Sequence, residues 1–298
     1  MAVSNKLVQR DGTGEPKTFS KYLSQEKVQQ SLLSTLGNQK SMEKFTSSVL
    51  SAVSVNKDLQ QCDFGSVVSA GLLANALELS LSPSLGFAYL VPFKDNKNNR
   101  TVATFILGYR GYIQLAIRSG YYKKLIVIDI KEGELVKADS INEEYVFSPI
   151  EDFNERENAK TVGYYAMFEH VNGFVKKMYW SKEKMLSHAD RYSKAFSLNG
   201  DKYHKPYKDY VEGKIPSTEL WKYSSHWYVD FDEMAKKTMI RQLLSKWGVM
   251  SIDMQRAYDS DTDSMMETES ENLEHEDDFD TFFDNEEQDD TEKEVVQS

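Results

Sequence analysis

The sequence predicts an α+β fold, and three observations lead to this class. The first eighty residues carry apolar side chains at helical spacing up to Pro83. From Phe87 onwards, runs rich in aromatic and β-branched residues are separated by turn signals, which is typical of antiparallel strands. A long helical pattern then follows near residue 230, and a strongly acidic segment with few large apolar residues ends the chain. We therefore expect a helical N-terminal part, antiparallel strands, a long C-terminal helix and a disordered acidic tail.

Three helices are expected in the N-terminal part. The first covers Ser24 to Leu36, with its first residue as the N-cap and a glycine just beyond its end. Ser41 is expected to cap a second helix that runs to about Val55, and a third helix covers Asp63 to Leu79. Residues 1–20 are polar and contain glycine, so we expect a flexible N-terminus.

The middle of the chain predicts a hairpin, a helix and a strand. Segments Phe87 to Phe93 and Thr101 to Leu107 are expected to be strands joined by a polar loop over residues 94–100. Tyr109 to Ser119 predicts a helix, because a glycine stops the pattern at the next position. Tyr121 to Ile130 predicts a further strand.

A second hairpin follows. Val162 to Val171 and Phe174 to Trp180 flank the dipeptide Asn172-Gly173, the strongest short-range hairpin signal. Tyr145 to Phe147 is a short candidate strand before it. Ser181 is expected to cap a short helix that reaches about His188.

The last part predicts an irregular segment and a long helix. Residues 191–228 show no regular pattern, whereas Asp230 to Trp247 has the spacing of a helix and is followed by a glycine. We expect one folded domain over residues 21–258, between the flexible N-terminus and a disordered tail over residues 259–298.

The charge is distributed unevenly. The whole chain of 298 residues has 36 basic and 47 acidic residues, a net charge of −11. Residues 259–298 hold 18 acidic residues and one basic residue, which leaves a net charge of +6 on the rest. A basic body with an acidic tail is typical of a protein that binds a polyanion. Within the tail, Phe279, Phe282 and Phe283 form a cluster that could dock on a partner.

Several classes of chemistry find no support in the sequence. No phosphate-binding loop, dinucleotide fingerprint or nucleophile elbow is present. Cys62 lies near the start of a predicted apolar helix and is expected to be a buried small residue rather than a nucleophile. One cysteine excludes an intrachain disulfide. His188 with Asp190 and His226 with Asp230 could each supply two metal ligands, but no third ligand is close in sequence. We expect no catalytic residue and no resident metal.

The segment from Arg191 to Tyr228 combines basic and aromatic residues. It contains nine aromatic residues in 38, about a quarter, against 12% for the chain. Cations neutralise phosphates and flat rings stack on bases, so the segment favours single-stranded nucleic acid. The alternative, a loop pinned to the core by tyrosines, is equally consistent. The candidates for phosphate contact are Arg191, Lys194, Lys205 and Lys208, and those for base stacking are Phe196, Tyr203 and Tyr207, together with Tyr109 in the preceding helix.

Two helices present arginines without an acidic neighbour in the next turn. On the helix from Tyr109, Arg110, Gln114 and Arg118 are each four residues apart and share one face. On the last helix, Arg241 has no acid three or four residues away, and Lys237 repels it, so an external anion would resolve the conflict. The basic hairpin loop supplies three further candidates for phosphate contact: Lys94, Lys97 and Arg100.

Three segments resemble motifs of the RecT family of phage recombinases. Phe105 to Gly120 resembles its central motif, Arg191 to Ala195 its short Arg-x-Ser-Lys segment, and Asp232 to Arg241 its C-terminal helix motif. The similarity spans Ser24 to Met254. The resemblance implies an α+β fold in which a helix crosses a curved antiparallel sheet, and it adds Lys237 to the candidate DNA contacts.

The resemblance also implies a function. Such proteins anneal complementary single strands without ATP and hold the new duplex in an oligomer, a ring or a helical filament. The implied partners are single-stranded DNA, the annealed duplex, a phage 5′-to-3′ exonuclease and a host single-strand-binding protein, in the cytoplasm of a bacterial host. No cofactor is expected to be required, although Mg²⁺ could modulate DNA binding, and no membrane association is expected. Two alternatives stay open: a metal-dependent DNA nuclease and a passive single-strand-binding protein.

Overall fold

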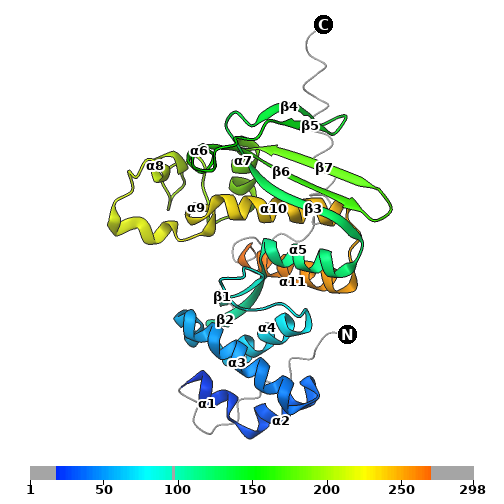
Figure 1. Ribbon diagram of the computed structural model, residues 1–298. Coiled ribbons are helices and arrows are strands. Elements are labelled where there is room, and N and C mark those ends of the chain that lie inside the picture. The colour runs from blue at the N-terminus through cyan, green and yellow to red at the C-terminus, as the bar shows by residue number, and fades with distance from the viewer. Residues whose placement is uncertain (1–17, 96–97, 270–298) are drawn as a thin grey trace.

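The computed structural model describes residues 18–95 and 98–269, with side chains as far as Thr262, and confirms the α+β class (Figure 1). Lys97 and the three tail phenylalanines therefore lie outside the described residues. The N-terminal helices and one hairpin occupy one end of the molecule, and the larger sheet occupies the other. Helices α5 (Tyr109–Ser119) and α11 (Ile252–Glu269) lie between these two ends.

The N-terminal end contains four helices and one 3-10 turn: α1 (Phe19–Leu23), α2 (Glu26–Leu36), α3 (Gln39–Val55), η1 (Lys57–Gln61) and α4 (Phe64–Ala76). The expected helices are present, but two of the expected caps are wrong. Ser24 closes α1 instead of capping α2, and Asn38 caps α3 by accepting a hydrogen bond from the Ser41 N–H at 2.8 Å. The expected boundary of the N-terminal segment at residue 20 is wrong, because α1 begins at Phe19 and buries that side chain against the core.

Strands β1 (Ala88–Asp95) and β2 (Arg100–Leu107) form the expected antiparallel hairpin. Helix α4 packs on it, and its N-terminus is tied to β2. The Asp63 N–H donates to the Thr101 carbonyl at 2.7 Å, and the Ala103 N–H donates to the Ser66 hydroxyl at 2.8 Å. These bonds join the helical end to the hairpin that leads into α5.

The larger sheet has three antiparallel strands in the order β3-β6-β7: β3 (Tyr122–Lys131), β6 (Thr161–His170) and β7 (Val175–Ser181). The expected turn at Asn172-Gly173 joins β6 to β7, with a φ of +88° at the glycine. A second hairpin, β4 (Leu135–Asp139) with β5 (Glu144–Phe147), follows β3. Strand β5 was expected, whereas β4 was not.

The central strand β6 is buried on both faces, with the period of two that a strand imposes. Tyr164, Ala166 and Phe168 face the main core beneath α10 (Phe231–Trp247). Tyr165 and Met167 face the other side, in a smaller cluster that includes residues of the β4–β5 hairpin. Helix α10 thus crosses one face of the sheet, as expected.

Short helices connect β7 to α10. After α7 (Lys182–Tyr192), the expected irregular segment contains short helical turns: α8 (Tyr207–Val211), η2 (Ser217–Tyr223) and α9 (His226–Val229). A further short helix, α6 (Phe153–Asn158), precedes β6. Ser181 caps α7 by accepting from the Lys184 N–H, as expected.

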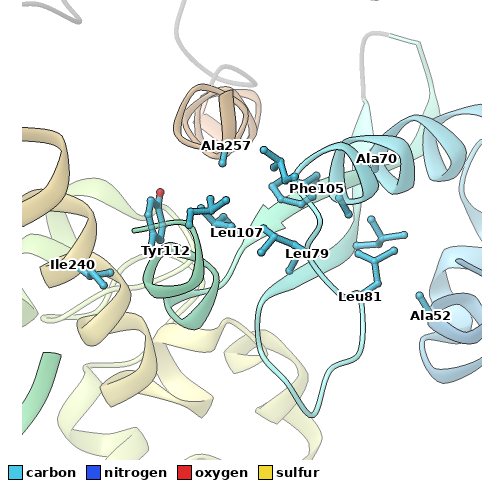
Figure 2. Packing of buried hydrophobic residues seen from close by; sticks show 14 of the residues in the cluster. Ala52, Ala70, Leu79, Leu81, Phe105, Leu107, Tyr112, Ile240 and Ala257 are labelled. Atoms are coloured by element: carbon cyan, nitrogen blue, oxygen red, sulfur yellow. The ribbon is translucent and has the colours of Figure 1, made fainter. Parts of the chain in front are cut away.

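The expected tail boundary at residue 259 is wrong. Helix α11 continues to Glu269 and packs on β2 and α5. Met254 and Ala257 are buried in the main core, and Figure 2 shows Ala257 above Phe105 and Leu107 of β2. The acidic composition of this segment led to the prediction of disorder, because composition does not record the spacing at which apolar residues recur.

Candidate nucleic-acid interface

Two glycines of the central motif, Gly108 and Gly111, let α5 approach the loop before β1. A Cβ on Gly108 would lie 2.1 Å from the Gly86 carbonyl oxygen, and one on Gly111 would lie 2.1 Å from that of Phe87. Only glycine allows this contact. The close approach fixes the first turn of α5 against the β1 strand and sets the direction in which Arg110 projects.

Arg110 belongs to a cluster that we call the α5–α10 junction: Tyr89, Tyr109, Arg110, Glu233 and Lys236. The exposed Arg110 donates through Nε to the Tyr109 hydroxyl at 3.1 Å, and this bond raises the pKa of the guanidinium. The ammonium of Lys236 lies 5.1 Å from the centre of the Tyr109 ring and is paired with Glu233. Burial alone would lower the pKa of Lys236, but the Glu233 contact raises it, so both cations stay charged.

Helix α5 packs on α10, which brings together motif segments more than a hundred residues apart in sequence. Tyr89 completes the junction from β1, with 37% of its surface exposed. The sequence patterns did not single out Tyr89 or Lys236, and Lys236 pairs with Glu233 three residues earlier on α10.

Arg118 has an ion partner that the sequence did not indicate. Its Nη1 lies 3.2 Å from Glu78 Oε2, and its Nη2 donates to the Leu77 carbonyl. The expectation that Arg118 lacks an acidic partner is therefore wrong, while its contact with a phosphate stays a prediction. Gln114, which lies between them on α5, is half-buried.

Lys237 and Arg241 also have an internal anion. Lys237 is only 6% exposed, and its Nζ lies 2.8 Å from Asp261 Oδ1. Arg241 Nε lies 3.9 Å from Asp261 Oδ2, and its Nη2 donates to the Thr262 hydroxyl at 2.7 Å. The expectation that Arg241 lacks an anion fails because Asp261 is twenty residues away, on α11.

The other cationic candidates come from the 191–228 segment and from the β1–β2 hairpin. Arg191, Lys194, Lys205 and Lys208 are exposed, and Lys208 lies 3.8 Å from Glu212. In the β1–β2 hairpin Lys94 is exposed, and Arg100 pairs with Asp95 at 3.0 Å.

The aromatic residues of the 191–228 segment divide into two groups. Phe196 is 3% exposed and packs on Tyr207 and Tyr228, with ring centres 5.1 and 5.0 Å away, so it has no face for a base. Burial raises the pKa of Tyr207 to about 12, which places this ring within the same cluster. Tyr203 and Trp221 are 65% and 73% exposed. Phe196 and Tyr207 therefore fit the alternative of a loop held to the core by aromatic packing. The rings of Tyr203 and Trp221 remain accessible to a ligand.

The remaining candidates for chemistry are limited. Cys62 is buried, and burial together with Asp58 and Asp63 raises the pKa of its thiol to about 11. Across residues 18–95 and 98–269, no three His, Cys, Asp or Glu side chains are grouped so that they could hold a metal ion. In the same part of the chain no helix is long and apolar enough to span a bilayer.

The fold and the two packed motif helices define a mixed α+β protein with a cationic and aromatic junction. Comparison with known families matches residues 43–277 to the RecT family. The chain therefore belongs to the RecT family.

Two curated relatives agree with this assignment. The chain is 37% identical over 213 residues to an uncharacterised protein YqaK of Bacillus subtilis strain 168, and 31% identical over 206 residues to Protein RecT of Escherichia coli K12. These matches cover 72% and 68% of this chain but only 62% and 65% of the relatives.

Proposed function

We propose that this chain is an ATP-independent single-strand annealing protein of homologous recombination. It binds single-stranded DNA through phosphates, pairs it with a complementary strand and holds the product in an oligomer. Its membership of the RecT family supports the class of activity. It acts by binding and positioning and has no catalytic residue.

One observation carries the proposal. The central and C-terminal motifs pack together as α5 and α10, and the exposed Arg110 projects from the junction between them. Arg110 lies in the first turn of α5, the positive end of the helix dipole, so both the guanidinium and the helix attract a phosphate. Tyr89 and Tyr109 lie beside it and offer ring surface to a sugar or base.

Phosphate contacts suit an annealing protein because they give affinity without sequence preference and leave base edges free to pair. Annealing is energetically downhill, since stacking and pairing supply the free energy, and the protein needs only to lower the repulsion between strands. No nucleotide is required. We propose that Mg²⁺ modulates DNA binding only by screening phosphates.

We also propose the partners of this activity. A few phosphate contacts in one subunit cannot hold a long strand pair, so neighbouring subunits line up along it as a ring or filament. A 5′-to-3′ exonuclease supplies the single strand, and a host single-strand-binding protein is a second partner. Exposed Tyr203 and Trp221, outside the junction, are available for contacts with DNA or with a neighbouring subunit.

Binding to fluorescent oligonucleotides of several sequences, measured against salt concentration, tests the phosphate-contact mechanism. Affinity should fall steeply as salt rises, with little dependence on sequence. A log–log slope near zero contradicts it. Gel analysis of the same strands with Mg²⁺ tests the nuclease alternative, since an annealing protein leaves strand length unchanged whereas a nuclease shortens it.

Light scattering tests the oligomer. Assemblies should grow when both complementary strands are added. A monomer with and without DNA would contradict this part of the proposal.

A further inference from the structure

A fully buried carboxylate lies at the centre of the contact between α11 and the body. Asp261 Oδ1 accepts from the Leu107 N–H at 3.2 Å and from Lys237 Nζ at 2.8 Å. Asp261 Oδ2 accepts from the Tyr112 hydroxyl at 3.0 Å, with Arg241 Nε 3.9 Å away. The four groups around the carboxylate come from β2, α5 and α10.

These groups form a donor set suited to an oxyanion. Two cations, one hydroxyl and one backbone N–H converge on a single position, and phosphate oxygens are bound in proteins by the same kinds of donor. Leu107, Tyr112, Lys237 and Arg241 all lie within the two long motif segments. The anion that fills the set, in contrast, comes from the acidic C-terminal region that follows them.

The helix that carries Asp261 is attached by a mixed contact. Met254 and Ala257 are buried against the core, while the next turn is held by Asp261 and Thr262 through polar contacts with α5, α10 and β2. Figure 2 shows the Tyr112 hydroxyl on the side where α11 lies. The sequence of α11 has six acidic residues and one basic residue, so its charge opposes that of the DNA-binding body.

We propose that Asp261 is an internal competitor of DNA: its carboxylate occupies a phosphate site of the annealing surface, and a bound strand displaces it together with the end of α11. This inference rests on the proposed function. A carboxylate and a phosphodiester each carry one negative charge and cannot share the same donors. The apparent affinity for DNA is therefore reduced by the fraction of molecules in which α11 is docked.

The first test compares two variants of α11 that remove the same charge. Asp261→Asn removes the buried carboxylate, and Asp259→Asn removes an exposed one two residues earlier. Binding to single-stranded oligo(dT) at low salt should be about fivefold tighter or more for Asp261→Asn, in the range of allosteric couplings. Asp259→Asn should bind like the wild type. Equal affinity of the two variants overturns the proposal.

The second test uses the wild-type protein, so it holds even where Asp261→Asn fails to fold. Linkage requires that DNA loosens α11 if α11 opposes DNA. Hydrogen exchange should show that α11 amides lose protection when oligo(dT) binds, while amides of β6 do not. Unchanged or increased protection of α11 overturns the proposal.

The two levels of the account fail in different ways. If the wild type binds and anneals single strands but either test gives the contrary result, only the role of Asp261 is wrong. If the wild type binds no oligo(dT), the proposed function is wrong, and the role of Asp261 falls with it.

Discussion

Replacing Arg118 with alanine should destabilise the fold rather than the DNA complex. Arg118 reaches from the last turn of α5 to the end of α4 and donates to the carbonyls of Leu77 and Glu78 and to the Glu78 carboxylate. Glu78 has a φ of +52°, a left-handed conformation that costs a non-glycine residue roughly 1 kcal/mol or more. The hydrogen bonds of Arg118 therefore stabilise a strained turn.

The magnitude follows from the exposure of each contact. The Glu78 side chain is 82% exposed, so its ion pair contributes at most about 1 kcal/mol. The bond to the carbonyl of Leu77, a buried residue, is charge-assisted and contributes about 1.5–3 kcal/mol. We expect Arg118→Ala to lower the free energy of unfolding by about 2 kcal/mol, most of it from the carbonyl contact.

Urea denaturation followed by circular dichroism measures this loss, and fluorescence anisotropy measures DNA affinity on the same samples. Glu78→Gln is the matched control, since it removes only the ion pair and should cost less than about 1 kcal/mol. The reasoning is refuted if Arg118→Ala keeps wild-type stability and loses DNA affinity.

Three further predictions each concern a single side chain. Arg110→Ala should weaken binding to single-stranded DNA and reduce the log–log salt slope by about 1, with stability within about 0.5 kcal/mol of wild type in urea titrations; an unchanged slope would exclude a phosphate contact. Tyr164→Phe removes the hydroxyl that donates to Asp232 at 2.6 Å and should cost about 1.5–3 kcal/mol in the same assay, whereas a neutral effect would mean that this bond does not hold α10 to the sheet. Burial would raise the pKa of Glu134, but hydrogen bonds from Arg156 and from backbone N–H groups lower it below its ordinary value. The ionised Glu134 therefore stabilises the fold fully above about pH 4.3, and this contribution is lost as pH falls through the folded-state pKa. Glu134→Gln should therefore flatten the acid limb of a stability–pH profile.

Elements with local signals could be predicted from the sequence. Asn172-Gly173 fixes the turn between β6 and β7, and Gly120 ends α5 in the left-handed conformation that glycine favours. Strand β4 could not be found in this way, because most of its residues are exposed and it lacks an alternating apolar pattern. Its position depends on pairing with β5, which the local sequence does not encode.

The partners of the arginines could not be predicted, because the rule for helix surfaces covers only three or four residues. Arg118 pairs with Glu78 forty residues earlier, and Arg241 meets Asp261 twenty residues later. Arg110, whose prediction rests on the same rule, remains exposed in the folded chain. Identical local patterns thus lead to different environments once the chain folds.

Helix α11 was missed because its acidic composition was considered and the helical spacing of its buried residues was not. Met254, Ala257, Tyr258 and Asp261 follow the i, i+3, i+4, i+7 pattern of one helix face, with an acid at the last position. A search for apolar residues at helical spacing would not predict that Asp261 is buried. Its burial is explained only by the donors that β2, α5 and α10 bring to it.

The most direct test of the proposed function is the rate at which two complementary, dye-labelled single strands anneal in the presence of the wild-type protein and without any nucleotide. Energy transfer between the dyes should rise faster than for the strands alone, and dye-labelled strands of unrelated sequence should give no such rise. A rate equal to or slower than spontaneous pairing would contradict the account and favour a passive single-strand-binding protein.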